Sequence, residues 1–235
     1  MGYPLKVYKV MGKASRKKIY IGILFVVGIM PFELNGFYNP HLIKNPVLFW
    51  SIDVFTYVIM PLCIYLAGIR KKLYTNKELG FHFDIHGREK ATPFFIGLIL
   101  LPFIFYYGFF LFNYIGAYLL EGVAGKLTFD YSQAVSGGIA IRIINVIYLA
   151  ISAGLVEEFY YRGMFKLLFK PGRFNVILYV LLSAVIFSSV HWEGGNVKLF
   201  TTFLFGLVAA CAYLWVKNLW PLVFAHFVAD FLLFY

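Results

Sequence analysis

The chain has 235 residues, of which 61% are hydrophobic and only 14% are charged, and its mean hydropathy is +0.78. A soluble domain is nearer half apolar and about a quarter charged, so this composition excludes a soluble fold and predicts a polytopic membrane protein. The net charge of +10 comes mostly from basic residues between apolar runs, where it reports membrane topology and not nucleic-acid binding. Cys63 and Cys211 both lie in apolar runs and offer no disulfide framework.

About seven apolar runs, each near the ~20 residues that a bilayer requires, divide the chain. They lie near residues 19–34, 47–69, 93–120, 138–165, 174–192, 198–216 and 219–235. No small-residue cleavage site follows the first run, so we expect an uncleaved span and not a signal peptide. No repeat or linker is visible. The sequence therefore predicts an all-α fold, one integral membrane domain over residues 1–235 that forms a helical bundle of six to eight spans.

The basic residues alternate between the connections of these runs. Many precede the first run or follow the second, fourth and sixth: Lys6, Lys9, Lys13, Arg16, Lys17, Lys18, Arg70, Lys71, Lys72, Lys77, Arg88, Lys90, Lys166, Lys170, Arg173 and Lys217. The alternate connections carry Lys44, Lys126 and Lys198. Because cytoplasmic loops are enriched in Lys and Arg, we expect the N-terminus to be cytoplasmic. The compact length and short loops favour a bacterial cell membrane.

The stretch Glu157-Glu158-Phe-Tyr-Tyr-Arg162 places three charges inside the fourth apolar run. Each charge in a lipid-spanning helix costs a few kcal/mol, so such residues are rarely incidental. Glu158 and Arg162 are four residues apart with the glutamate first, which is the favourable order for an ion pair on one helix face. Glu157 points about 100° away, and is expected to be free for chemistry.

Three more polar residues interrupt the last apolar runs. His191 ends the stretch Phe187-Ser-Ser-Val-His191, and His226 lies four residues before Asp230, so that both share one helix face. Each residue alone is as well explained by a hydrogen bond between neighbouring helices. A Glu, two His and an Asp in one half of the chain favour a shared site instead.

Helix lengths test whether these side chains can meet. Pro171-Gly172 marks a turn between two antiparallel helices. At ~1.5 Å per residue, Glu157 lies about 21 Å before this turn and His191 about 27 Å beyond Arg173, a difference of around one helical turn. The match is poorer for His226, which lies only about 12 Å beyond Asn218. The geometry permits a common site without requiring it.

A buried carboxylate with two imidazoles is suited to the activation of a water molecule. Burial in a medium of low dielectric constant raises the pKa of a carboxyl group towards neutrality, where it is a competent general base. The same Glu157, His191 and His226 could instead bind a divalent metal such as zinc that activates the water. The sequence leaves both mechanisms open, and it contains neither His-Glu-x-x-His nor Gly-x-Ser-x-Gly.

The three stretches resemble the motifs of the CPBP family of intramembrane proteases, which includes the CAAX prenyl proteases and the bacterial Abi proteins of bacteriocin processing and self-immunity. The family pattern is Glu-Glu-x-x-x-Arg, then Phe-x-x-x-His, then His-x-x-x-Asn/Asp. Glu157 to Arg162, Phe187 to His191 and His226 to Asp230 follow it in the same order. The resemblance covers residues 138–235, which are expected to form the catalytic core.

The resemblance implies that Glu157 and His191 activate the hydrolytic water. His226 and Asp230 would help to bind the oxyanion or a metal, with Glu158 and Arg162 in support. Asp230 departs from the Asn of the eukaryotic prenyl proteases, and an ionised Asp cannot donate a hydrogen bond to an oxyanion. Its role therefore stays open.

The sequence predicts an intramembrane endopeptidase of the CAAX protease type, either a metalloprotease or a glutamate-type enzyme. It would cut a membrane-associated peptide or protein near the cytoplasmic face, with lipid and substrate as partners and no nucleic acid. The alternative is a non-catalytic immunity or scaffold protein. A transporter is less favoured, because no repeated half with paired broken helices is visible.

Overall fold

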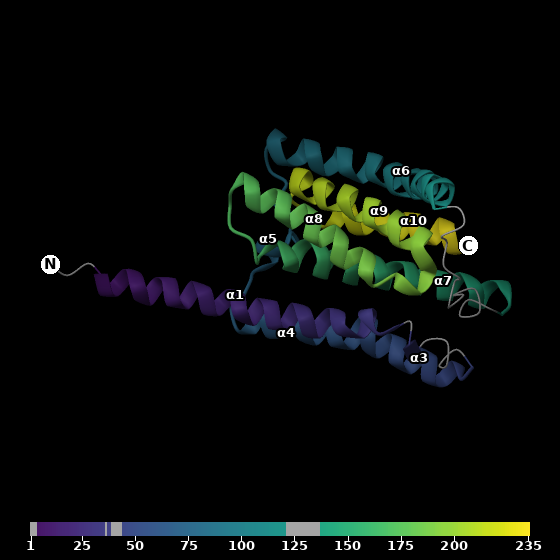
Figure 1. The fold of residues 1–235 in the computed structure, drawn as a ribbon, viewed down its shortest axis with the longest axis horizontal. Helices are drawn as coiled ribbons and strands as arrows, with labels where there is room; N and C mark the ends of the chain where they lie inside the picture. Colours follow the sequence, from purple (N-terminus) through teal and green to yellow (C-terminus); the bar gives the residue numbers. More distant parts are fainter. Residues whose placement is uncertain (1–3, 36, 39–43, 121–136) are drawn as a thin grey trace.

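The computed structural model describes residues 4–35, 37–38, 44–120 and 137–235, with the backbone alone for residues 4–14. All regular elements within these ranges are helices (Figure 1). In chain order they are α1 (Pro4–Glu33), α3 (Pro46–Val54), the π-helix η1 (Phe55–Ile59), α4 (Met60–Arg70), α5 (Asn76–Leu79), α6 (Arg88–Leu119), α7 (Ile139–Glu157), the π-helix η3 (Glu158–Met164), α8 (Arg173–Ser189), the 3₁₀ turn η4 (Trp192–Gly194), α9 (Gly195–Val216) and α10 (Trp220–Phe234). Lys126, which was counted in the predicted topology, lies outside the described residues.

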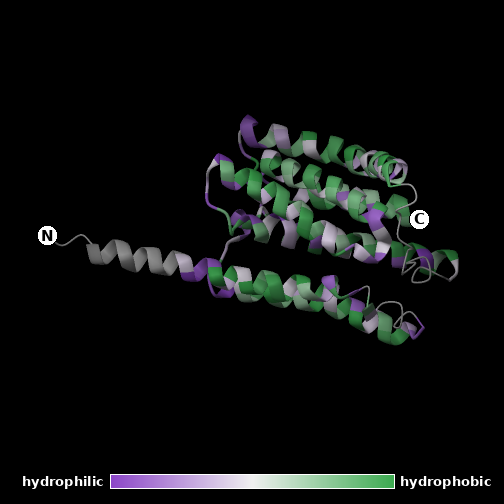
Figure 2. Cartoon of the chain, in the orientation of Figure 1, coloured by the Kyte–Doolittle hydropathy of each residue, from purple (hydrophilic) through white to green (hydrophobic). Residues whose placement is uncertain are grey.

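Four helical runs in the described ranges are long and apolar enough to cross a membrane. They are Pro46–Arg70, Arg88–Leu119, Ile139–Met164 and Trp192–Val216, and the apolar helices Arg173–Ser189 and Trp220–Phe234 are shorter. Hydrophobic residues cover these helices along most of their length, while hydrophilic residues gather near several helix ends (Figure 2). The protein is therefore an all-α integral membrane bundle, as predicted, and the count of about seven spans stays a prediction.

The second half of the chain forms the centre of the bundle. Helix α8 packs on α9, α9 packs on α6, and α10 lies against both α6 and α7. Helix α1 runs beside α4 and contacts η3 (Figure 1). Aromatic rings join these two parts: Phe25 meets Tyr161 at 6.4 Å and Phe32 meets Tyr160 at 6.2 Å between ring centroids. The α1–α4 pair thus packs directly on the segment that carries the acidic motif.

That segment, predicted as an apolar span over residues 138–165, changes from α-helix to π-helix at Glu158. A π-helix bonds i to i+5, so local carbonyl groups lose their usual partners, and such bulges are frequent at functional sites. Helix α8 supplies two donors: the Ser183 hydroxyl donates to the Tyr161 carbonyl at 2.8 Å, and the Tyr179 hydroxyl donates to that of Arg162 at 3.4 Å. Packing on α8 therefore stabilises the wider turn.

The connections after α4, η3 and α9 meet at one end of the bundle. Backbone N–H of Leu219 donates to the Gly80 carbonyl at 2.9 Å, and the Asn218 side chain donates to the carbonyl of His82 at 2.7 Å. Nearby, hydrogen bonds from the Lys77 and Lys90 ammonium groups, each 2.9 Å from Asp84, hold the pKa of that carboxyl well below its usual range. This end carries the basic connections of the predicted topology.

Candidate active site

His226 lies at the centre of a buried charged cluster between α7–η3 and α10. Its Nδ1 atom is 3.0 Å from Glu158 Oε1, and Glu158 Oε2 is 3.4 Å from Arg162 Nε. The side chains of Glu158 and Arg162 are completely buried, and that of His226 is 6% exposed. The predicted pair of Glu158 with Arg162 is therefore present, and Glu158 also holds one face of the imidazole ring.

The other ring nitrogen of His226 faces two more carboxyl groups. Nε2 lies 3.6 Å from Glu157 Oε2 and 3.5 Å from Asp230 Oδ2. Glu157 thus escapes the Arg162 pair, as its place in the sequence predicted, yet it is not isolated. The hydrogen bond between Nδ1 and Glu158 orients the imidazole, since charge-assisted hydrogen bonds are directional and strong, while Glu157 and Asp230 act on Nε2 through their charge.

A close approach of two backbones brings these side chains together. A Cβ atom at Gly154 would lie 3.1 Å from the Val223 carbonyl oxygen and 3.5 Å from the Cβ of His226. Small residues permit such approaches between membrane helices. Gly154, one turn before Glu157, therefore sets the distance at which α10 presents His226 to the two glutamates.

His191 follows the last residue of α8 and lies beside the same cluster. Its Nδ1 atom is 2.9 Å from the Phe187 carbonyl oxygen, which can only accept, so Nδ1 carries the proton and Nε2 of the neutral ring is the acceptor. The Phe187 ring lies 5.1 Å from that of His191 and 6.4 Å from that of His226. The Arg162 guanidinium carbon is 4.3 Å from the Phe187 centroid. One phenyl ring therefore separates the cation from both imidazoles.

A cavity opens beside these histidines where α8 and α10 end and α9 begins. It is lined by Phe109, Phe187, His191, Lys198, Thr202, Phe205, His226, Ala229, Asp230 and Leu233. Three of the four residues predicted to be catalytic therefore line one cavity. Glu157 does not line the cavity, but its Oε2 atom lies 3.6 Å from Nε2 of His226, and His226 does line it.

The possible metal ligands were tested against this geometry. In the part of the chain that the structure describes, no group of three or more His, Cys, Asp or Glu side chains is placed to hold a metal ion. Both nitrogens of His226 face carboxyl oxygens, and Nδ1 of His191 faces a carbonyl oxygen. These contacts leave the Nε2 atoms of both histidines without a hydrogen bond among the described residues, so the metal-binding role of Glu157, His191 and His226 stays a prediction.

Two residues beside the cluster, Lys198 and Phe205, have no motif in the sequence that marks them. Lys198 was counted as a loop residue, although it lies on the first turn of α9 and lines the cavity. Phe205, whose ring is 5.6 Å from that of His226, looked like any other core residue. The only available signal was the position of Lys198 at the start of an apolar run that follows His191.

Within the membrane helices, carboxyl and imidazole groups are buried together beside a cavity, an arrangement that marks a candidate functional site. Residues 138–232 match the family model described as type II CAAX prenyl endopeptidase Rce1-like. This region, which contains every residue of the cluster, is therefore similar to the CAAX protease family of intramembrane peptidases. No curated protein and no solved structure matches the chain.

Proposed function

We propose that the protein hydrolyses a peptide bond of a membrane-associated peptide or protein by means of water activated by Glu157 and His191. The observation that carries this proposal is the convergence on His226. Glu157 and Asp230 lie within 3.6 Å of one ring nitrogen, beside a cavity that His191 also lines. A buried carboxyl group and a histidine with a free acceptor nitrogen are the groups that general acid–base catalysis requires.

In the proposed reaction Glu157 accepts a proton from water as the water oxygen attacks the carbonyl carbon. His191 Nε2 orients that water by accepting its second hydrogen. Collapse of the tetrahedral intermediate breaks the C–N bond, and the proton held by Glu157 passes to the leaving amine. Glu158 and Arg162 touch no reacting atom in this scheme. They position His226, since Glu158 holds Nδ1 at 3.0 Å and Arg162 neutralises Glu158.

The test replaces Glu157 with glutamine, which preserves the side-chain volume and removes the base. Loss of a general base costs typically 10²–10⁴-fold, so we expect uncleaved precursors to accumulate in Glu157→Gln cells. Comparative peptidomics and membrane proteomics against wild-type cells would identify them. Glu89→Gln is the matched control, because Glu89 is exposed on the first turn of α6.

Unchanged processing in Glu157→Gln cells at equal expression would contradict the proposal. If that variant also kept any protective or regulatory activity in cells, the chain would be a non-catalytic immunity or scaffold protein, which was the alternative from the sequence.

A further inference from the structure

Lys198 is a charged residue in the cavity for which the motifs give no role. It is the fourth residue of α9, one turn after η4, and it shares the cavity lining with His191, His226 and Asp230. Its Nζ atom lies 4.7 Å from the centroid of the Phe109 ring. A lysine in a cavity between membrane helices costs free energy, so it is rarely retained without a function.

The two cations of this region, Arg162 and Lys198, differ in whether they form an ion pair. Arg162 is fully buried, pairs with Glu158, and is not among the residues that line the cavity. Lys198 is the basic residue of that lining, and it forms none of the ion pairs within 4.0 Å found among the described residues. It nevertheless interacts electrostatically with Asp230, Glu193 and Glu157. Lys198 therefore places positive charge in the cavity without being fixed to a carboxylate.

Peptide hydrolysis requires a donor for the negative charge that develops on the carbonyl oxygen, and such preorganised donors contribute strongly to catalysis. Asp230 Oδ2 lies 3.5 Å from His226 Nε2, which is an ion-pair distance. An ionised Asp has no hydrogen to donate, whereas an Asn at this position would have two. An acidic residue at position 230 therefore leaves the site short of a donor that the Asn form of the motif provides.

We propose that Lys198 is the oxyanion-binding residue of this enzyme, a catalytic role that rests on the proposed function. As the water oxygen bonds to the carbonyl carbon and Glu157 takes the proton, the π electrons move to the carbonyl oxygen. The Lys198 ammonium donates a hydrogen bond to that oxyanion and keeps its own proton. When the C–N bond breaks, the electrons return from the oxygen and the proton on Glu157 passes to the amine. Lys198 stabilises the intermediate, while Asp230 and His226 neither gain nor lose a proton.

The experiment uses full-length protein in detergent and, as substrate, membranes from Glu157→Gln cells, in which uncleaved precursors accumulate. New peptide termini are quantified by mass spectrometry over a range of membrane concentrations. We expect Lys198→Met to lower the maximal rate about 100-fold, the loss typical of one oxyanion donor, with little change in the half-saturating concentration. Lys198→Arg keeps a donor and should retain most of the rate. Lys170→Met is the matched control, because Lys170 is exposed outside the site.

A second variant separates catalysis from folding. Lys198→Met combined with Asp230→Asn loses the ammonium and gains an amide donor, so we expect at least a tenfold recovery over Lys198→Met alone. Asp230→Asn alone should not raise the rate. A Lys198→Met rate within threefold of wild type would overturn the role of Lys198 and leave the proposed function intact. The role of Lys198 would also be overturned if Lys198→Met changed only the half-saturating concentration. It would be overturned as well if the double variant recovered no activity over Lys198→Met alone. Absence of precursors in Glu157→Gln cells would overturn the proposed function itself.

Discussion

At the scale of single residues, the site depends on how three carboxyl groups are distributed around His226. Glu158 is the buried partner of both Arg162 and His226 Nδ1, while Glu157 and Asp230 share Nε2. Adjacent residues on one helix therefore serve different purposes. Glu158 holds the ring, and Glu157 lies at the other ring nitrogen, where the proposed mechanism uses it as the base.

Arg162 gives the sharpest stability prediction, because its guanidinium is buried between Glu158 and the Phe187 ring. Removal of one partner of a buried ion pair leaves an uncompensated charge, which costs about 3–5 kcal/mol. We expect Arg162→Met to lower the free energy of unfolding by that amount, as measured by denaturant unfolding in detergent micelles. Arg173→Met makes the same change at an exposed position and should stay within about 0.5 kcal/mol of wild type. Equal stability of the two variants would refute the structural role of the pair.

At the scale of elements, the site depends on irregular helix geometry and on close helix packing. The π-helix η3 begins at Glu158, directly after Glu157, and hydroxyl groups of α8 satisfy two of its carbonyls. The neighbouring helix α10 approaches α7 closely at Gly154. Neither the π-helical turn nor the close approach can be predicted from the residue types alone, because both depend on the helix that packs alongside.

Gly154 provides a prediction at this scale. In Gly154→Val the new Cβ would lie 3.1 Å from the Val223 carbonyl oxygen, so α10 must move away and His226 must leave the glutamates. We expect processing of the accumulated precursors to fall more than tenfold and stability to fall by about 1–3 kcal/mol, the cost of overpacking. Gly108→Val is the control, since the nearest atoms there belong to a Phe112 side chain at 3.7 Å. Wild-type activity in Gly154→Val would show that the close approach is not needed.

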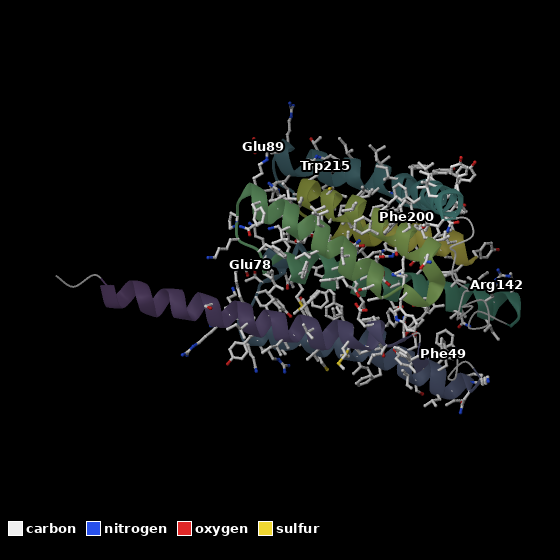
Figure 3. All side chains as sticks on the ribbon, viewed as in Figure 1. Phe49, Glu78, Glu89, Arg142, Phe200 and Trp215 are labelled. Atoms are coloured by element: carbon white, nitrogen blue, oxygen red, sulfur yellow. The ribbon has the colours of Figure 1, made fainter. Side chains whose placement is uncertain are left out.

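At the scale of the whole molecule, the cavity and the basic connections lie at opposite ends. The connections that carry Arg70, Lys170 and Lys217 are at the end where α6 and α8 begin. The cavity lies where α8 and α10 end and α9 begins, and Arg142 of α7 donates a 2.6 Å hydrogen bond to the Tyr235 carbonyl just after α10. In Figure 3, Glu78 and Glu89 lie near the end with the basic connections, and Arg142 lies near the opposite end.

This arrangement bears on the face at which cleavage occurs. With the predicted cytoplasmic N-terminus, the basic connections are cytoplasmic and the cavity lies in the half of the membrane that is remote from the cytoplasm. That placement points away from a cut near the cytoplasmic face, which the sequence alone suggested.

Cysteine labelling tests the orientation. In a background without Cys63 and Cys211, we expect a membrane-impermeant maleimide to label the Gly138→Cys variant in intact cells and the Lys170→Cys variant only after permeabilisation. A Cβ atom at Gly138 meets nothing within 4 Å and Lys170 is exposed, so neither change should disturb the fold. The reverse labelling pattern would place the N-terminus outside and return the cavity to the cytoplasmic half.

The amino-acid sequence by itself determined the class of the protein and singled out most of the residues of the proposed site. Composition and run length predict an apolar helical bundle, because the cost of exposing backbone groups to lipid leaves few alternatives. The spacing of Glu158 and Arg162 predicts their ion pair, because i and i+4 share a helix face. Charges in apolar runs are costly, so Glu157, His191, His226 and Asp230 stood out without any structure.

Only the tertiary structure decided how these residues are arranged around His226 and the cavity. The pairing of His226 with Glu158, the π-helical turn and the entry of Lys198 into the cavity all depend on contacts between segments that are distant in the chain. Such contacts follow from the approach of whole helices, which local spacing does not encode. Lys198 shows this best: beside His191 in the sequence it looked like a loop cation, and only the packing of α9 against α6 and α10 makes it part of the site.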